Sequence, residues 1–334
     1  MLWWAGMEAR AARLAVVVPA FRVADRVVDV VAGIPPVASA IYVVDDACPD
    51  RSGARVREAL HDSRVCVIEH DRNQGVGGAT VTGFRRALAD GADIVVKLDG
   101  DGQMSPADIL CLVEPILAGE ADFTKGNRFW DLEGLAAMPV VRVTGNAVLS
   151  FVTKFSTGYW NVFDPTNGFV AVHREALVRL PLEKVSRRYF FESDLLFRLY
   201  VARAVVQDVS LEARYAGETS GLRPFRVIPE FLYKHARNLV KRLFYSYFLR
   251  DFNIASLELL FGGWLLLWGA GFGTLAWVRS ARQVQPATAG TVMLAGLPII
   301  LGVQLLVGFL QFDFQNVPRR PLSARRAVPG PPAA

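Results

Sequence analysis

Val95-Val96-Lys97-Leu98-Asp99-Gly100-Asp101-Gly102-Gln103 has the form of a buried strand that ends in two carboxylates. Side chains alternate along a strand, so Asp99 and Asp101 lean to the same side. Mg²⁺ and Mn²⁺ prefer oxygen ligands and are commonly shared between one or two carboxylates and substrate phosphates. Gly100 and Gly102 leave room for a diphosphate to approach the backbone. The stretch predicts metal-assisted handling of a nucleotide diphosphate, although an Asp-Gly turn that merely closes a strand has the same composition.

Apolar runs of strand length alternate with segments of helical periodicity on both sides of this stretch. The alternation predicts an α/β domain with a mostly parallel central sheet wrapped by helices. In such sheets ligands gather at the carboxyl ends of the strands, where Pro19, Phe21, Asp45 and Asp46 also lie. We expect strands at 14–19, 41–44, 65–69 and 94–98, and helices at 25–32, 51–61, 78–90 and 106–117.

Two motifs near the first strands are candidates for donor contacts. Asp45 and Asp46 can accept hydrogen bonds from a nucleobase or ribose, or they can cap the next helix, for which Asp50 is a natural N-cap. The run Asn-Gln-Gly-Val-Gly-Gly at 73–78, which contains Gly75, resembles a glycine-rich phosphate loop that leads into a helix. A plain turn has the same composition, so the run leaves both interpretations open.

Two pairs of charged residues in the second half are further candidates. Lys125 and Arg128 follow a strand-like run at 121–124 and could bind a phosphate, because Arg offers planar bidentate donors. Solvated loop charges are the alternative. Glu192 and Asp194 lie at the start of an apolar helix, where burial raises the pKa of a carboxyl toward the range of a general base. Helix capping and a structural ion pair are the alternative there.

The C-terminal third is apolar enough to enter a membrane. The segments 259–278 and 287–311 carry no charged residue, and we predict transmembrane helices at 257–278 and 287–312. Each reaches the roughly 20 residues that cross a bilayer as a helix. The chain has 334 residues, a net charge of +5 and a pI near 9.2. This basic balance suits nucleic acid or an anionic membrane, and the apolar segments favour the membrane, with no nucleic acid partner.

The flanks of these segments predict the orientation. More basic residues precede and follow the pair than lie between them, so the catalytic part and the C-terminus are expected in the cytoplasm of a multi-pass membrane protein. The segment 223–256 interleaves cations with aromatic residues, as does an amphipathic helix on a membrane surface. Residues 318–334 read as a disordered cytoplasmic tail. Three scattered cysteines, Cys48, Cys66 and Cys111, fit a reducing compartment.

Four motifs together resemble those of the family 2 glycosyltransferases. The resemblance covers residues 13–222 and extends into the apolar segments. It is closest to the branch of polyprenol-phosphate sugar synthases, which also carry C-terminal membrane helices. It implies an inverting enzyme with a single catalytic domain of the GT-A fold. The motifs are, in order, Val18-Pro19-Ala20-Phe21, Val43-Val44-Asp45-Asp46, Asn73-Gln74-Gly75-Val76-Gly77 and Leu98-Asp99-Gly100-Asp101-Gly102-Gln103.

The resemblance also implies roles for individual residues. The sequence departs from the family pattern at two points. Arg22 and Val23 replace the Asn-Glu that often follows the first motif, and the Gln-x-x-Arg-Trp motif of processive synthases is absent. The implied roles are nucleobase contact for Asp46, contact with the donor ribose or diphosphate for Asp99, binding of Mg²⁺ or Mn²⁺ for Asp101 and Gln103, contact with the acceptor phosphate or donor for Arg128, and the general base for Glu192 or Asp194.

The sequence therefore predicts a membrane-anchored, metal-dependent inverting glycosyltransferase. The expected donor is a nucleotide-diphosphate sugar and the expected acceptor is a polyprenyl phosphate, for cell-envelope glycan synthesis. The first alternative is transfer to a hydroxyl of a lipid-linked glycan, for which Glu192 or Asp194 would act as base. More distant alternatives are a sugar nucleotidyltransferase, which needs a glycine- and lysine-rich loop absent from 19–33, and a non-catalytic membrane assembly protein.

Overall fold

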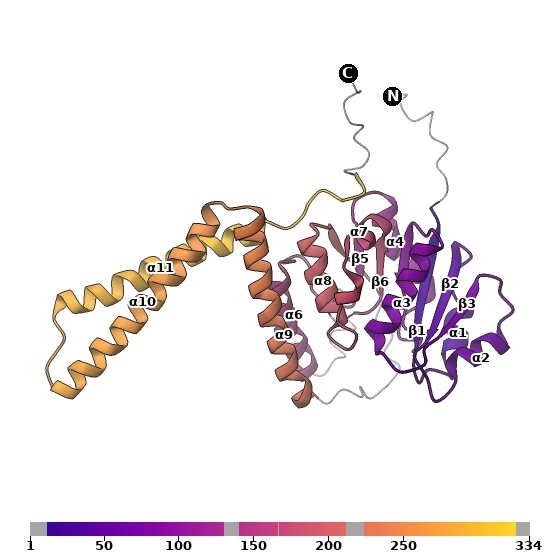
Figure 1. Cartoon of the computed structure of the whole chain (residues 1–334), viewed down its shortest axis with the longest axis horizontal. Helices are drawn as coiled ribbons and strands as arrows, with labels where there is room; N and C mark the ends of the chain where they lie inside the picture. The colour runs from indigo at the N-terminus through magenta and orange to yellow at the C-terminus, as the bar shows by residue number, and fades with distance from the viewer. Residues whose placement is uncertain (1–11, 130–139, 166, 212–223, 325–334) are drawn as a thin grey trace, which may run out of the picture. The chain divides into compact units, whose positions relative to one another are not determined.

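The computed structural model describes residues 12–129, 140–165, 167–211 and 224–324 (Figure 1). The chain divides into two compact units. The first contains Met1–Asn238 together with Pro318–Ala334, and the second contains Leu239–Val317. The predicted end of the catalytic domain at residue 222 lies outside the described residues.

The first unit is built on a seven-stranded sheet with the order β3-β2-β1-β4-β6-β5-β7. The strands β1 to β4 pair in parallel, β6 is antiparallel to both β4 and β5, and β5 is parallel to β7. The strands are β1 (Leu14–Ala20), β2 (Ala38–Asp45), β3 (Val65–Glu69), β4 (Ile94–Lys97), β5 (Phe123–Asn127), β6 (Val170–His173) and β7 (Val206–Ser210).

Helices cover the sheet of this unit (Figure 1). Helices α1 and α4 pack on a core formed by alternate residues of the strands, among them Val16, Val43 and Val96. Helix α3 packs against β1 and β2. The helices are α1 (Val27–Ala32), α2 (Ser52–Ala59), α3 (Val76–Ala89), α4 (Ile109–Leu117), α6 (Val140–Thr157), α7 (Arg174–Arg179), α8 (Phe191–Val201) and α9 (Pro224–Phe244), with short 3₁₀ turns at Pro106–Asp108 and Leu182–Lys184.

The predicted α/β class and mostly parallel sheet are confirmed. Each predicted strand and helix of the first 117 residues is present, within a few residues of its expected ends. Strands β6 and β7 were not anticipated, because the sequence after residue 126 shows no clear periodicity. Since β5 runs parallel to β4, its carboxyl end and the start of β6 lie at the same edge of the sheet as the carboxyl ends of β1, β2 and β4.

The chain after the second apolar helix returns to the first unit. The carboxylate of Asp122, which is fully buried, accepts the backbone N–H of Leu322 at 2.8 and 2.9 Å and that of Ser323 at 3.3 Å. The same carboxylate accepts the N–H of Val205 at 2.8 Å. The prediction of a disordered tail over 318–334 therefore differs from the structure at residues 318–324, and residues 325–334 lie outside the described part of the chain.

The second unit is dominated by two long helices, α10 (Ile254–Gln283) and α11 (Ala289–Gln315), which lie side by side (Figure 1). Both are long and apolar enough to cross a membrane. Helix α10 contains the predicted segment 257–278, and α11 covers the predicted segment 287–312 except for its first two residues. Glycines allow the close approach: a Cβ on Gly302 would lie 2.8 Å from the backbone nitrogen of Leu266, and one on Gly269 would lie 2.8 Å from the carbonyl of Ala295. Small residues at such contacts are typical of helices packed in lipid.

A buried ion pair closes one end of this helix pair. Arg242 near the end of α9 contacts Asp313 near the end of α11 at 2.5 and 3.1 Å. The hydroxyl of Tyr247, in the π-helical turn Tyr245–Arg250, donates to the same carboxylate at 2.6 Å. All three side chains are essentially inaccessible to solvent. A buried charge needs such partners, so the triad ties the segment before α10 to the end of α11.

We predict that Asp122→Ala destabilises the first unit by about 3 kcal/mol, because three backbone N–H groups lose their acceptor in a buried place. The thermal unfolding midpoint of the full chain in detergent should fall, and limited proteolysis should cut within residues 318–324. The control is Glu120→Ala, because Glu120 is exposed two positions away. An unchanged midpoint and cleavage pattern for Asp122→Ala would contradict the role given to this carboxylate.

Candidate active site

The acids that end β4 lie at the edge of the sheet. The side chain of Asp99 is 30% exposed. The carboxylate of Asp101 accepts the backbone N–H of Gln103 at 3.0 Å, and the guanidinium of Arg26 donates to the Asp101 carbonyl at 3.0 Å. The predicted pair of strand-end carboxylates is therefore present as a tight turn, with Gln103 beside it and the cation of Arg26 near its backbone.

Lys97 lies directly beneath this turn. Its ammonium donates to both carboxylate oxygens of Asp99, at 2.8 and 3.0 Å, and to the carbonyl of Gly168 at 3.1 Å. It also lies 3.8 Å from a carboxylate oxygen of Glu192. Burial acts to lower the pKa of Lys97, but the carboxylates of Asp99 and Glu192 raise it above its usual value. Lys97 therefore stays charged and links the two acids.

Asp164 and Gly168, which come from a stretch with the composition of an ordinary turn, lie at the same site. A Cβ on Gly168 would overlap the Asp99 carboxylate and the Lys97 ammonium, so a larger residue there would displace these two side-chain ends. Asp164 is buried and accepts a bidentate contact from Arg128 at 2.8 and 3.2 Å. Burial acts to raise the pKa of Asp164, but the cations of Lys125 and Arg128 hold it below its usual value.

Lys125, a predicted phosphate ligand, points into the interior. Its side chain is 1% exposed, and its ammonium has no hydrogen-bond partner among the described residues. Burial lowers its pKa, while the carboxylates of Asp164 and Asp208 act in the opposite direction. Lys125 and Arg128 thus belong to one buried cluster of charges beside the strand-end acids. Whether this cluster binds a phosphate stays a prediction.

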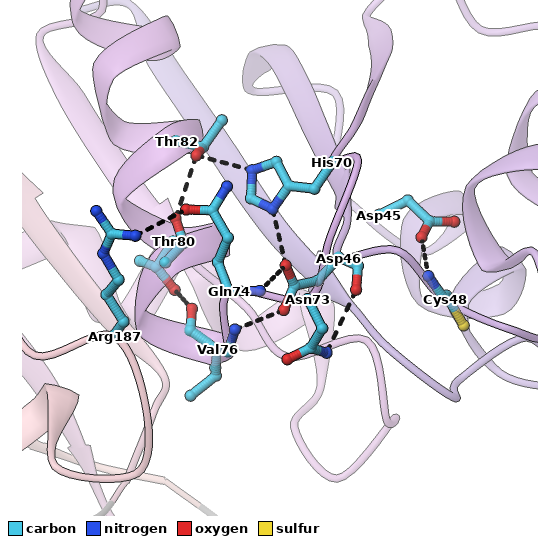
Figure 2. A network of polar contacts seen from close by, with 12 residues as sticks. Asp45, Asp46, Cys48, His70, Asn73, Gln74, Val76, Thr80, Thr82 and Arg187 are labelled. Carbon is cyan, nitrogen blue, oxygen red and sulfur yellow. Dashed lines mark hydrogen bonds and ion pairs between the residues drawn. The ribbon is translucent and has the colours of Figure 1, made fainter.

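Asp46, the predicted nucleobase contact, is buried at the centre of a polar network (Figure 2). Its carboxylate accepts the backbone N–H groups of Gln74 at 2.8 Å and Gly75 at 2.7 Å. It also contacts Nδ1 of His70 at 2.7 Å, and Nε2 of that ring lies 2.9 Å from the hydroxyl of Thr82. Asp46 therefore fixes the loop before α3 to the end of β2.

Asp45 and the first strand end also have defined positions. The carboxylate of Asp45 accepts the N–H of Cys48 at 2.7 Å and that of Gly53 at 2.6 Å, so Asp45 rather than the predicted Asp50 caps α2. Pro19 is buried in β1. Phe21 is 40% exposed, with the guanidinium of Arg22 over its ring at 5.4 Å. An exposed aromatic ring beside the carboxyl end of β1 is suitable for contact with a nucleobase.

The glycine run at the start of α3 faces a protein segment. A Cβ on Gly75 would lie 2.5 Å from the carbonyl of Arg187, and Gly75 has a φ of 85°. A Cβ on Gly77 would overlap the carbonyl of Ser186. The N–H of Gly78 donates to the Arg187 carbonyl at 3.1 Å. The close approach of residues 186–187 accounts for these glycines, so the predicted phosphate contact of Gly75 stays a prediction.

Glu192 and Asp194, the two candidate bases, have different surroundings. The carboxylate of Asp194 accepts the N–H of Ser186 at 2.9 Å and contacts Arg198 at 3.1 Å. The amide of Asn238 donates to its other oxygen at 3.3 Å. Glu192 instead faces Lys97 at the edge of the sheet. Burial raises the pKa of Glu192, and Lys97 opposes that shift. Asp194 therefore holds a loop while Glu192 faces Lys97, and the role of either acid as a base stays a prediction.

Sequence reasoning missed Lys97, His70 and the turn 164–168. Lys97 had a readable signal, because a charged residue within an apolar strand needs a carboxylate partner and Asp99 follows two positions later. His70 and the turn gave none, since their partners are distant in the sequence.

The strand-end residues fit a divalent cation that is completed by substrate. No group of three or more His, Cys, Asp or Glu side chains with metal-binding spacing exists in the described ranges. Mg²⁺ commonly binds one or two protein carboxylates and takes its remaining ligands from water and substrate phosphates. Asp99 and Asp101, with Gln103 beside them, match that donor set.

Comparisons with known proteins agree with this geometry. The model of the glycosyl transferase family 2 matches residues 15–180. A UDP-N-acetylglucosamine–dolichyl-phosphate N-acetylglucosaminyltransferase of Methanococcus voltae is 30% identical over 210 residues, which are 58% of this chain and 83% of that protein. The chain belongs to glycosyltransferase family 2. It is an enzyme of that family, which sets aside the nucleotidyltransferase and the non-catalytic assembly protein.

Other similar proteins carry related names. The polyprenol monophosphomannose synthase of Mycolicibacterium smegmatis is 34% identical over 161 residues, which are 47% of this chain and 60% of that protein. The glucosyl-3-phosphoglycerate synthase of Mycobacterium tuberculosis, solved with Mn²⁺, UDP and glucosyl-3-phosphoglycerate, superposes with a TM-score of 0.51 at 22% identity, covering 69% of this chain and 80% of that chain. This likeness shows the fold alone and confirms the predicted GT-A architecture.

We predict that Asp194→Ala lowers the stability of the fold much more than Glu192→Ala does. Loss of Asp194 leaves the N–H of Ser186 and the guanidinium of Arg198 unpaired, which should cost about 3 kcal/mol. Loss of Glu192 removes a carboxylate whose ion pair with Lys97 is long, at 3.8 Å, so the unfolding midpoint should change little. Thermal unfolding of both variants tests the assignment, and a larger loss for Glu192→Ala would reverse it.

Proposed function

We propose that the chain transfers a sugar from a nucleotide-diphosphate sugar to a polyprenyl phosphate, with inversion at the anomeric carbon. The observation that carries the proposal is the pair Asp99 and Asp101 at the end of β4, enclosed by the turn at Gly168, in a chain of family 2. The relatives named as dolichyl-phosphate and polyprenol-phosphate transferases support this acceptor class.

The residues at this edge would divide the work. When bound, Mg²⁺ or Mn²⁺ would offset the negative charge that develops on the departing nucleoside diphosphate. Asp99, Asp101 and Gln103 would hold it. Phe21 and the loop fixed by Asp46 would receive the nucleoside. Arg128, which Asp164 holds in place, would attract the acceptor phosphate toward the donor sugar.

A polyprenyl phosphate is ionised near neutral pH and attacks without a base. Transfer to a hydroxyl of a lipid-linked glycan is the second candidate, and the position of Glu192 favours it, because this acid lies near the strand-end acids with a raised pKa. Glu192→Gln separates the two. A loss in transfer below about tenfold supports the phosphate acceptor, and a loss of about 10² to 10⁴ supports the hydroxyl.

We also propose that the enzyme works at the cytoplasmic face of a membrane. Helix α9 exposes Leu232, Tyr233 and Val240 beside Arg237 and Lys241, which is the composition of a helix lying at a lipid surface. The basic residues before α10 and after α11 support a cytoplasmic position for both flanks, by the positive-inside rule.

The donor reaction gives the main test. Asp101→Asn should abolish Mn²⁺-dependent binding of UDP or GDP and lower transfer by about 10²-fold or more, because a neutral amide is a poor ligand for a hard cation. The assay is a screen of radiolabelled nucleotide sugars with membranes, followed by mild-acid release of the lipid product. The matched control is Asp50→Asn, at an exposed acid. Nucleotide binding that ignores both metal and the Asp101 variant would refute the proposal.

The orientation is tested with fusions. A fluorescent protein fused after residue 334 should fold and fluoresce, while a periplasmic phosphatase at the same point should be inactive. The same two reporters inserted at residues 284–288, between α10 and α11, should give the opposite pattern. A single pattern at both points would show that the helices do not span the membrane as a pair.

A further inference from the structure

Lys97 is a buried cation on which two acids of the site converge. The side chain is fully buried in β4, and its ammonium has three donors. Those donors meet both oxygens of Asp99 and the carbonyl of Gly168, with Glu192 3.8 Å away. The positive charge of the ammonium therefore balances the negative charges of Asp99 and Glu192.

This placement bears on how a divalent cation reaches the site. Both oxygens of Asp99 are hydrogen-bonded to the ammonium, which leaves this carboxylate a weaker ligand for a second cation. A divalent ion near Asp99 and Asp101 would also be repelled by a positive charge in low-dielectric surroundings. The protein alone gives few ligands, since the described residues hold no cluster of three metal-binding side chains.

We propose that Lys97 is a positioning residue that acts as a counter-cation for the strand-end acids. Its charge weakens the binding of a divalent metal ion to Asp99 and Asp101 unless a nucleotide diphosphate binds together with the metal. The inference rests on the proposed function. The diphosphate contributes the oxygen ligands and negative charge that the protein lacks, so metal and nucleotide bind together. Lys97 also fixes Glu192 beside the donor edge through the same ammonium.

The test measures Mn²⁺ binding by the full chain in detergent, from the paramagnetic resonance signal of free Mn²⁺, with and without UDP or GDP. The wild-type chain should bind Mn²⁺ at least about tenfold more tightly when nucleotide is present. In the absence of nucleotide, Lys97→Met should bind Mn²⁺ at least about tenfold more tightly than the wild-type chain does. The reason is that Asp99 and Glu192 lose the cation that balances their charges. Lys97→Gln, which keeps a polar group, should show the same change.

The matched control is Lys125→Met. Lys125 is equally buried and lies on the neighbouring part of the sheet, but its ammonium makes no hydrogen bond to Asp99 or to any other described residue. Its removal should leave the affinity for Mn²⁺ alone unchanged within about threefold. Equal tightening in both lysine variants would overturn the proposal, because general electrostatics would then explain the effect.

Other outcomes separate this inference from the proposed function. Wild-type chain that binds neither nucleotide with Mn²⁺ refutes the proposed function itself. Wild-type chain that binds Mn²⁺ alone as tightly as with nucleotide overturns the role of Lys97, and this result needs no variant to fold. A third outcome is a folded Lys97→Met variant whose affinity for Mn²⁺ is unchanged but whose binding of UDP or GDP is weaker. Lys97 would then contact the donor nucleotide, and the proposed role as a counter-cation would be overturned.

Discussion

The contact of one ammonium with two carboxylates and a carbonyl organises the candidate site. Lys97 joins the end of β4 to the start of β6 through Gly168 and faces the start of α8 through Glu192. A cation in the interior requires such partners, because its desolvation is costly without them. The elements that carry the strand-end acids, Gly168 and the candidate base are thus held by one charged group.

Most other charged residues at this edge hold loops in place. Asp46 binds the loop before α3, Asp45 caps α2, and Asp194 fixes the segment that precedes α8. Backbone N–H groups that approach a buried carboxylate satisfy both partners, so each acid stabilises a loop. Asp99 and Phe21, by contrast, are partly open to solvent.

A second buried pairing lies at one end of the two apolar helices. Arg242, Tyr247 and Asp313 close one end of the α10–α11 pair, and glycines let those helices approach. After α11 the chain meets Asp122 in the first unit. Chain segments on both sides of the helix pair are therefore anchored by specific polar contacts.

The sequence by itself determined the α/β class, the strands up to β4, the acids at their carboxyl ends and the two apolar helices, because each depends on local periodicity or length. It also named Glu192 and Asp194 as candidate bases. Only the tertiary structure gave these two acids different surroundings, assigned the glycines of 75–78 to the approach of residues 186–187, and brought Lys97 to Gly168. Each of these contacts depends on how the chain folds. Lys97 and Gly168, for example, are 71 positions apart in the sequence, and local periodicity carries no information about contacts between such distant residues.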